Sequence, residues 1–261
     1  SESQLQIVVT SATMNVDMFR EFFELRSGLK VVSIKLSGIS FPVLVEYRNI
    51  ADLDEEEIGT FGTAAVKMSV AVQAVFELVE ATEFGNILVF VPGLEDAIQG
   101  MVLLNDMLQQ DDKKTTAVRS LFTRRKQDKK KRANGFCEGV EVFALAEETP
   151  QEEKESLFNC TAKQMVVFAT NVAETGITLP NIHYVVDVGL DRRPKWTNDP
   201  LGMTTMTSQW ISQSAADQRK GRAGRVRPGY CLRLYSEETF ETVLQSFSKP
   251  QIDNANIEHT I

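Results

Sequence analysis

The chain has 261 residues, of which 43% are hydrophobic and 25% are charged. These proportions are typical of a folded globular protein of one large or two modest domains, and they exclude a disordered tail or a fibre. Three widely spaced cysteines are too few for a disulfide scaffold, and two histidines without any C-x-x-C spacing predict no metal site. Uninterrupted apolar stretches are only a few residues long, far below the roughly 18 to 20 that span a bilayer.

The net charge is −8, from 28 basic and 36 acidic side chains, but the charges are unevenly distributed. Residues 123–132 contain seven basic side chains and one acidic, and residues 219–233 contain six basic side chains and no acid. Acidic residues dominate 52–57. A local field acts over a Debye length of about 8 to 10 Å, so an acidic protein can still present a basic groove to nucleic acid.

Short apolar, β-branched runs alternate along the chain with longer amphipathic segments. Strands are predicted at Leu5–Thr10, Leu44–Tyr47, Ile87–Val91, Val140–Ala144, Met165–Ala169, Tyr184–Asp187 and Tyr230–Tyr235. Helices are predicted at Met14–Phe23, Ala64–Glu80, Leu94–Leu108 and Pro150–Phe158. Near-continuous apolar strands imply burial on both faces, and their alternation with helices predicts an α/β fold with a parallel sheet.

Polar residues mark the starts of two of these helices. Thr13 or Asn15 is placed to cap the first helix. Thr149 is placed as the N-cap of the last one, with Pro150 at the first helical position and Glu152 at the third. We therefore expect the last helix to begin directly behind Thr149.

The order of the elements predicts parts of three domains. Residues 1–36 hold too few elements for a domain and are expected to form the C-terminal edge of a first one, cut from a longer protein. A linker at 37–42 leads to a second α/β domain at 43–248, and residues 249–261 would begin a third. The stretch 113–139 has almost no apolar period and is predicted to be an exposed insertion.

The strongest motif is QRKGRAGR at 218–225. Arg222 and Arg225 are three residues apart, so on one helical turn they would point the same way. Glycine and alanine between them would let that turn approach a partner closely. Arginine is permanently charged and its guanidinium binds phosphate oxygens in a fork, so the motif predicts a polyphosphate site.

Polar side chains also follow two predicted strands. Thr170 and Asn171, with two further threonines, belong to ATNVAETGIT at 169–178, directly after a strand. Ser11 and Thr13 follow the first predicted strand. Ligands of open α/β sheets gather at the carboxyl ends of strands, so these side chains are placed to bind phosphates or sugars.

Together, in this order and spacing, the segments resemble superfamily 2 helicases, and more narrowly the DEAH-box/RNA helicase A-like ATP-dependent RNA helicases. The matching segments are SATM at 11–14, ILVFVPG at 87–93, TPQEEKESLF at 149–158, ATNVAETGIT at 169–178, YVVDVG at 184–189 and QRKGRAGR at 218–225. The resemblance implies a second RecA-like domain of the P-loop NTPase type, a parallel sheet with helices on both faces. It also implies a protruding β-hairpin at 190–209 and an intracellular protein whose compartment stays open.

The resemblance further implies that ATP and Mg²⁺ lie between two RecA-like domains and that single-stranded RNA crosses both. In that arrangement Gln218 would position the attacking water, and Arg222 and Arg225 would act as arginine fingers. The implied nucleotide-binding residues are Phe158, Gly176, Thr178 and Asn181. The implied RNA-backbone contacts are Gly93, Thr170, Asn171 and Thr178, and Ser11 and Thr13 would couple the two ligands. Members of this group often need an accessory activator protein.

Several positions depart from the pattern of the resembled family. They are Ile39, Pro92, Gln164, Met165, Gly176, Pro180 and Asn254. They leave open an alternative, a catalytically inactive helicase-like scaffold or an RNA-docking subunit of a larger RNA–protein assembly. A DNA-directed motor of the same superfamily is a further alternative.

The 261 residues contain neither G-x-x-x-x-G-K-[ST] nor an Asp-Glu-x-His tetrad, the motifs that bind ATP and hold magnesium. The chain alone is therefore expected not to hydrolyse ATP. The basic run at 124–132 has two interpretations, a loop that contacts RNA or the ribosome, or a solvated insertion or localisation signal. The second interpretation is the one we favour.

Overall fold

A computed structural model describes residues 7–11, 15–36, 38, 40–48, 55–82, 84–110, 119–120, 139–196 and 204–248. The predictions for Thr13, the basic run 124–132 and residues 249–261 lie outside these residues. The contacts divide the chain into two units, residues 1–39 and residues 40–261, and each is described by itself.

The first unit contains α1 (Val16–Glu21), which continues into a π-helical turn, η1 (Phe22–Arg26). Asn15 caps α1, because its side chain accepts a hydrogen bond from the Met18 backbone N–H at 3.1 Å. The strand predicted at 5–10 is wrong over the described residues 7–10, which form no strand. A strand needs a partner for its backbone groups, and the described residues of this unit include none.

The second unit contains a seven-stranded sheet in which every neighbouring pair is parallel, in the order β1-β9-β6-β2-β5-β4-β3. Its strands are β1 (Val43–Tyr47), β2 (Asn86–Phe90), β3 (Arg119–Ser120), β4 (Val140–Leu145), β5 (Gln164–Ala169), β6 (Ile182–Asp187) and β9 (Gly229–Arg233). The α/β parallel sheet predicted from the sequence is confirmed. Every residue of β5, an interior strand between β2 and β4, is buried, which explains the unbroken apolar run at 165–169.

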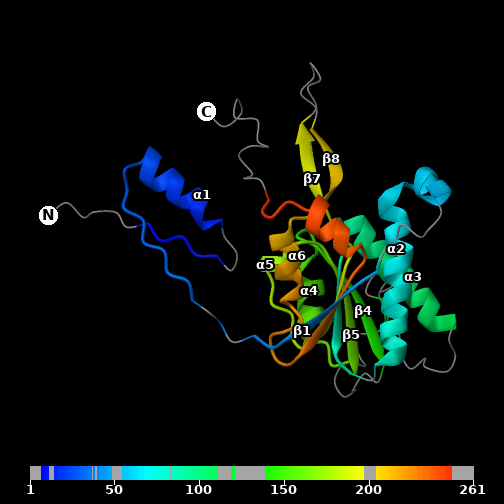
Figure 1. The fold of residues 1–261 in the computed structure, drawn as a ribbon. Coiled ribbons are helices and arrows are strands. Elements are labelled where there is room, and N and C mark those ends of the chain that lie inside the picture. The colour runs from blue at the N-terminus through cyan, green and yellow to red at the C-terminus, as the bar shows by residue number, and fades with distance from the viewer. Residues whose placement is uncertain are drawn as a thin grey trace. The chain divides into compact units, whose positions relative to one another are not determined.

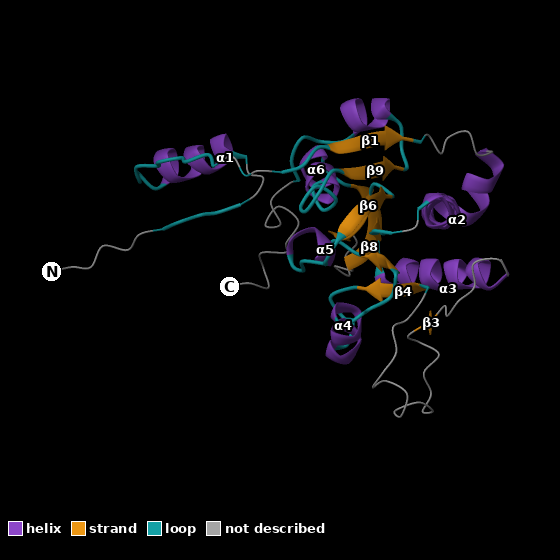
Figure 2. Ribbon diagram, turned by 90° about the horizontal axis from the view of Figure 1, so that it is seen from below, coloured by secondary structure: helices purple, strands orange, loops and turns teal. Residues whose placement is uncertain are grey.

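Helices cover both faces of the sheet. The helices of this unit are α2 (Glu55–Ala81), α3 (Leu94–Gln110), α4 (Gln151–Phe158), α5 (Val172–Thr175), α6 (Gln213–Lys220) and the π-helical turn η3 (Thr239–Val243). Figures 1 and 2 show α2 and α3 on one face and α4, α5 and α6 on the other. Alternate residues of β2 enter the two cores: Ile87 and Val89 pack toward α2 and α3, and Leu88 and Phe90 toward the opposite face.

The start of α4 differs from the prediction. Pro150 is the N-cap and the helix begins at Gln151, so Thr149 does not cap it. Instead the Thr149 hydroxyl accepts a hydrogen bond from the Ala146 backbone N–H at 2.8 Å. The threonine side chain thus closes the turn between β4 and α4, since the amide of Ala146 is the donor it reaches.

The predicted β-hairpin is present. It consists of β7 (Leu190–Trp196) and β8 (Thr204–Trp210), paired antiparallel with Leu190 opposite Trp210. The hairpin follows β6 directly and rises from the carboxyl ends of the strands (Figure 1).

Candidate functional site

Three of the four residues expected to contact RNA lie at the carboxyl edge of the sheet. Gly93 follows β2, and Thr170 and Asn171 follow β5, which pairs with β2 in parallel. The two strand ends are joined by a hydrogen bond of 2.9 Å from the Val91 N–H to the Ala169 carbonyl. Thr178 lies elsewhere, on the segment that returns from α5 to the start of β6.

The two arginines of the QRKGRAGR motif face that returning segment. Arg222 Nη1 lies 3.5 Å from the Ile177 carbonyl oxygen, and Arg225 Nη1 lies 3.2 Å from the Thr178 hydroxyl oxygen. Among the described residues neither guanidinium forms an ion pair. Burial, followed by the neighbouring charge of Arg225, lowers the pKa of Arg222. Two adjacent cations with unused donors form a site for an anion that carries several oxygens.

The expectation that these arginines share a helical turn is wrong. The helix α6 begins behind Ser212, whose hydroxyl accepts from the Ala215 N–H at 3.2 Å, and it ends at Lys220. A Cβ on Gly224 would lie 2.7 Å from the Phe41 carbonyl oxygen. The approach of the chain segment before β1 therefore requires a turn and a glycine where a continued helix would place its next residues.

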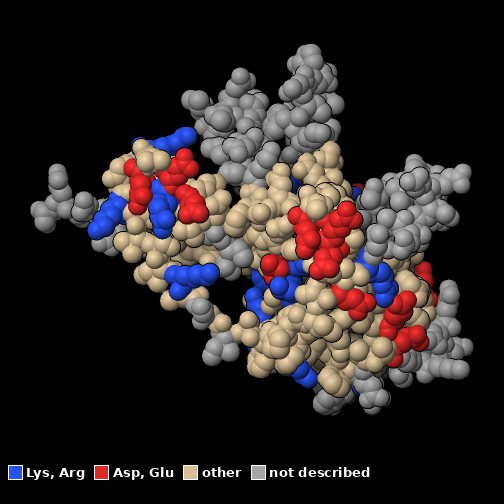
Figure 3. All heavy atoms as spheres, in the orientation of Figure 1, with Lys and Arg blue, Asp and Glu red and all other residues tan. Residues whose placement is uncertain are grey.

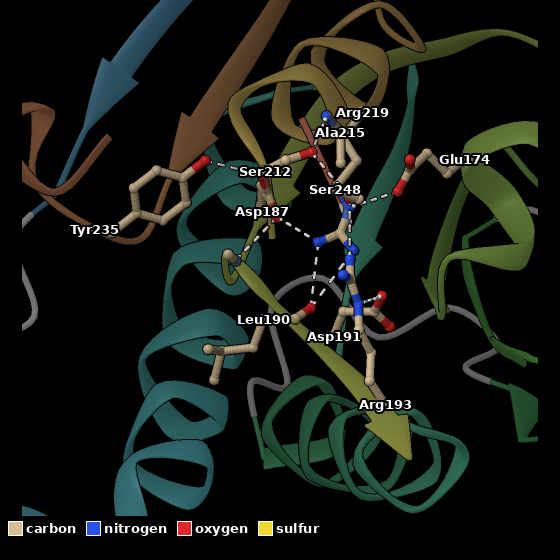
Figure 4. A network of polar contacts seen from close by, with 11 residues as sticks. Glu174, Asp187, Leu190, Asp191, Arg193, Ser212, Ala215, Arg219, Tyr235 and Ser248 are labelled. Carbon is tan, nitrogen blue, oxygen red and sulfur yellow. Dashed lines mark hydrogen bonds and ion pairs between the residues drawn. The ribbon is translucent and has the colours of Figure 1, made fainter. Parts of the chain in front are cut away.

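The remaining arginine of the motif, Arg219, is buried. Its Nη1 donates to Asp187 Oδ1 at 2.8 Å and its Nε to Glu174 Oε2 at 3.2 Å. Both Nη atoms also lie within 3.5 Å of the Leu190 carbonyl oxygen, the first of the hairpin. Figure 4 shows this network, which joins α6 to β6, α5 and β7. Arg219 is therefore a structural joint and cannot reach a ligand as Arg222 and Arg225 can.

The buried carboxylate of Asp187 is saturated by its neighbours. It accepts from the Gly189 N–H at 2.9 Å and from the Tyr235 hydroxyl at 3.1 Å, in addition to Arg219. Burial raises the pKa of Tyr235, so the phenol remains protonated and donates. Burial also raises the pKa of Glu174, whereas Asp187 and Glu174 favour the charged form of Arg219.

Sequence reasoning missed the role of Arg219, although a signal was present. Ala215 and Ala216 lie four and three residues before Arg219 on α6, and both are buried. This spacing is the apolar face of a helix, so a residue in the middle of that face is expected to be buried as well. Among the arginines of the motif, roles were expected for Arg222 and Arg225 alone and none for Arg219.

Two of the four residues expected to bind the nucleotide line one pocket. Phe158, at the end of α4 and 46% exposed, and Asn181, before β6, border a cavity of about 330 Å³. His183 and Arg227 line the same cavity, and the Arg227 guanidinium lies 5.5 Å from the ring centroid of Phe84. Gly176 does not border this cavity, and Thr178 instead contacts Arg225.

The remaining predicted residues are placed as follows. Gln218 is half-buried on α6, next to Arg219. Ser11 lies in the first unit, whose position relative to the second is not determined. Within the described ranges no group of His, Cys, Asp and Glu side chains is arranged to hold a metal ion. The described helices include none that is long and apolar enough to cross a membrane.

Charged side chains of both signs are interspersed on the described surface that Figure 3 shows. Basic side chains form separate small groups on this face rather than one continuous stripe. The described part of this face therefore presents no extended basic stripe to a polyanion.

A parallel sheet with helices on both faces, an arginine-rich turn after α6 and a hairpin at the carboxyl edge defines the second RecA-like domain of a helicase. The chain belongs to the helicase conserved C-terminal domain family, whose model matches residues 70–227. Its homology to DEAH-box RNA helicases of the HrpA type extends over nearly its whole length.

Three relatives illustrate the similarity. The chain is 31% identical to the ATP-dependent RNA helicase HrpA homolog of Haemophilus influenzae, over 98% of this chain and 16% of that protein. It is 29% identical to the pre-mRNA-splicing factor ATP-dependent RNA helicase prp22 of Schizosaccharomyces pombe, over 98% of this chain and 19% of that protein. The structure of the Escherichia coli DExH-box NTPase HrpB superposes with a TM-score of 0.62 at 26% identity, over 85% of this chain and 23% of that one. The chain thus spans less than a fifth of the length of these two sequence relatives.

Proposed function

We propose that this chain is the second motor domain of an ATP-dependent RNA helicase or RNA–protein remodelling ATPase. The observation that carries the proposal is the pair of guanidiniums on Arg222 and Arg225, directed at one segment and not ion-paired with any described carboxylate. Fixed positive charge of this kind stabilises the charge that develops on transferring phosphoryl groups. Gln218, on the helix that leads into this turn, is proposed to position the attacking water.

The nucleotide is proposed to lie along the face of the sheet that carries α4, α5 and α6. The exposed ring of Phe158 offers a stacking surface for a base, and Asn181 borders the same pocket. Thr178 and Gly176 lie on the segment between that pocket and the two arginines. This order matches a ligand with a base at one end and phosphates at the other.

Magnesium is proposed to be held by other parts of the full-length protein. The described ranges hold no group of His, Cys, Asp and Glu side chains that is arranged for a divalent ion. When bound, the ion would neutralise phosphate charge beside the two arginines. Their role on this chain is to orient and stabilise the phosphates.

Single-stranded RNA is proposed to cross the carboxyl edge of the sheet. Gly93, Thr170 and Asn171 meet there at the ends of β2 and β5, and the hairpin rises beside them. A glycine and short polar side chains allow a sugar–phosphate backbone to approach closely without reading its sequence. We further propose an intracellular protein that works with an accessory activator, and Ser11 and Thr13 as its coupling residues.

The experiment that tests this proposal is steady-state ATP hydrolysis by the full-length protein, with and without single-stranded RNA, over a salt series. Arg225→Ala is expected to reduce RNA-stimulated turnover at least about a hundredfold, because removing one preorganised charge costs this much. Lys220→Ala is the matched control. It removes a cation from the same motif, but this cation is paired with Asp217 and is not expected to face the phosphates. The chain of 261 residues alone is expected to show no turnover.

An inactive scaffold is the alternative that the departures at 39, 164–165, 176 and 180 favour. It predicts RNA binding by the full-length protein without RNA-stimulated hydrolysis. Unchanged turnover in Arg225→Ala would refute the finger role, whereas equal stimulation by single-stranded DNA would favour a DNA-directed motor.

A further inference from the structure

The side chain of Arg192 covers Gly93. A Cβ built on Gly93 would lie 2.9 Å from both Cδ and Nε of Arg192. The Arg192 backbone N–H donates to the Pro92 carbonyl at 3.3 Å, which fixes the base of β7 against the turn after β2. The guanidinium thus occupies the space above the one residue at this turn that has no side chain.

Two carboxylates at the start of α3 hold the guanidinium there. Arg192 Nη1 lies 3.1 Å from Glu95 Oε2, and Nη2 lies 3.4 Å from Asp96 Oδ2. The side chain of Glu95 is 84% exposed, that of Asp96 is 10% exposed and that of Arg192 is 34% exposed. The buried Oδ2 of Asp96 accepts no hydrogen bond from a described residue, so Arg192 is its counter-charge. The cation is reachable from solvent, but it is neutralised.

The arrangement cannot coexist with a ligand on Gly93. The space above Gly93 holds either the Arg192 guanidinium or a sugar–phosphate group, because Nε and Cζ of Arg192 lie within 3.1 Å of the point where a Cβ on Gly93 would be. An exposed ion pair such as that with Glu95 holds the guanidinium only weakly, because water screens both charges. A phosphate offers Arg192 a charge-assisted, forked contact and releases counterions on binding, so it can compete with the carboxylates.

We infer that Arg192 binds an RNA phosphate. In the free chain Glu95 and Asp96 hold its guanidinium over Gly93, and an RNA phosphate replaces these two carboxylates as its partner. The inference rests on the proposed RNA-binding function of the carboxyl edge. When Arg192 turns to the phosphate, the turn at Gly93 is uncovered for the backbone. The acidic pair therefore weakens the RNA affinity of the free chain.

The test measures binding of a fluorescein-labelled twelve-nucleotide oligouridine to the chain by anisotropy at low salt. Glu95→Gln is expected to tighten binding about two- to fivefold, because it removes one of the two carboxylates that hold the guanidinium. Arg192→Gln is expected to weaken binding and to lower the slope of log affinity against log salt by about 0.7, the value of one contact to single-stranded nucleic acid. In the Arg192→Gln background, Glu95→Gln is expected to change nothing further.

The matched control is Glu77→Gln, which removes another exposed carboxylate that is paired with an arginine, Arg48, at 3.2 Å. Circular dichroism and urea unfolding verify the fold of each variant, and Arg192→Met, which also removes the charge, serves if Arg192→Gln does not fold. Equal tightening by Glu95→Gln with and without Arg192 would reduce the effect to net charge and overturn the inference. Wild-type affinity and salt slope in Arg192→Gln would leave Arg192 as a hairpin anchor only.

Different results would overturn the role of Arg192 and the RNA-binding function of the carboxyl edge. Binding that is salt-sensitive but indifferent to Arg192 overturns the inference and leaves the proposed RNA function intact. Absence of binding by the folded wild-type chain and by all variants would overturn both.

Discussion

Arg219 and Arg222 have the same chemistry and lie three residues apart, yet they have opposite environments. Arg219 has two carboxylates and a carbonyl around it and is fully buried, whereas Arg222 is half-buried beside another cation. The first is committed to the protein and the second is available to a ligand. The difference lies in the partners, since the side chain itself is identical.

Arg219→Ala is expected to lower the free energy of unfolding by about 3 to 5 kcal/mol, because it leaves the charge of Asp187 buried without its partner. Arg222→Ala, which removes a weak contact of 3.5 Å to a carbonyl, is expected to change it by less than about 1 kcal/mol. Urea denaturation followed by circular dichroism compares the two variants. Equal losses would show that Arg219 has no special structural role.

The two described cysteines, Cys160 and Cys231, are expected to differ in reactivity because they differ in burial. Burial raises the pKa of Cys231 to about 12, so at pH 8 only about one thiol in ten thousand is a thiolate. Cys160 is partly exposed. Treatment of the native chain with a thiol reagent at pH 8, followed by peptide mass mapping, is expected to modify Cys160 and spare Cys231. Modification of Cys231 at a similar rate would contradict its buried, protonated state.

At the scale of elements, the β-hairpin is fixed at its base by three parts of the unit. The Leu190 carbonyl accepts from Arg219 of α6, Arg192 pairs with the start of α3, and Arg193 Nη2 donates to the Ser248 hydroxyl at 3.3 Å. Gly189 at the entry to β7 has a φ of +80°. These contacts orient the hairpin relative to the turn that carries Arg222 and Arg225.

Gly189→Ala is expected to destabilise the unit by about 1 to 3 kcal/mol from its left-handed backbone alone. A Cβ there would also lie 2.6 Å from the Tyr235 ring and 3.0 Å from that of Trp210, which adds to the cost. Gly176→Ala is the matched control, since its backbone is right-handed and its Cβ would lie 3.1 Å from the Val172 carbonyl oxygen. Urea denaturation of both variants measures the difference, and equal midpoints would contradict the steric argument.

At the scale of the whole molecule, the two units differ in how much they bury. The three hydrophobic clusters consist of residues of the second unit alone. In the first unit α1 has no buried residue, and Val8, Val32 and Leu36 are among its exposed apolar side chains. The second unit therefore has a complete core of its own, and the first does not show one within its described residues.

A chain beginning at Ser40 is expected to unfold in urea at the same midpoint as the full 261 residues, because it retains every residue of the three clusters. It also retains the hydrogen bond from the Phe41 N–H to the Gly224 carbonyl at 2.9 Å. Circular dichroism gives both midpoints. A clearly lower midpoint for the shortened chain would show that residues 1–39 contribute to its stability.

Much of the fold and part of the site could be predicted from the sequence. Apolar runs such as the one at 165–169 are buried on both faces, so burial imposes on them a pattern that is local and readable. Thr170 and Asn171 were expected at a strand end for the same reason, since chain order alone places a segment after its strand. The strand expected at 5–10 and the cap at Thr149 were not predictable, because backbone pairing and competing hydrogen-bond donors decide them.

The sequence by itself thus determined the parallel α/β sheet and the residue types suited to a polyanion, and its resemblance to a known family implied the hairpin. Only the tertiary structure decided which arginines are available to a ligand. Arg219 is paired with Asp187 and Glu174, and Arg192 is paired with carboxylates at the start of α3. Arg222 and Arg225 are paired with no described carboxylate. These contacts join residues far apart in the chain. A local pattern records the chemistry of a side chain, whereas its charge is left free or neutralised by whatever partners the fold brings to it.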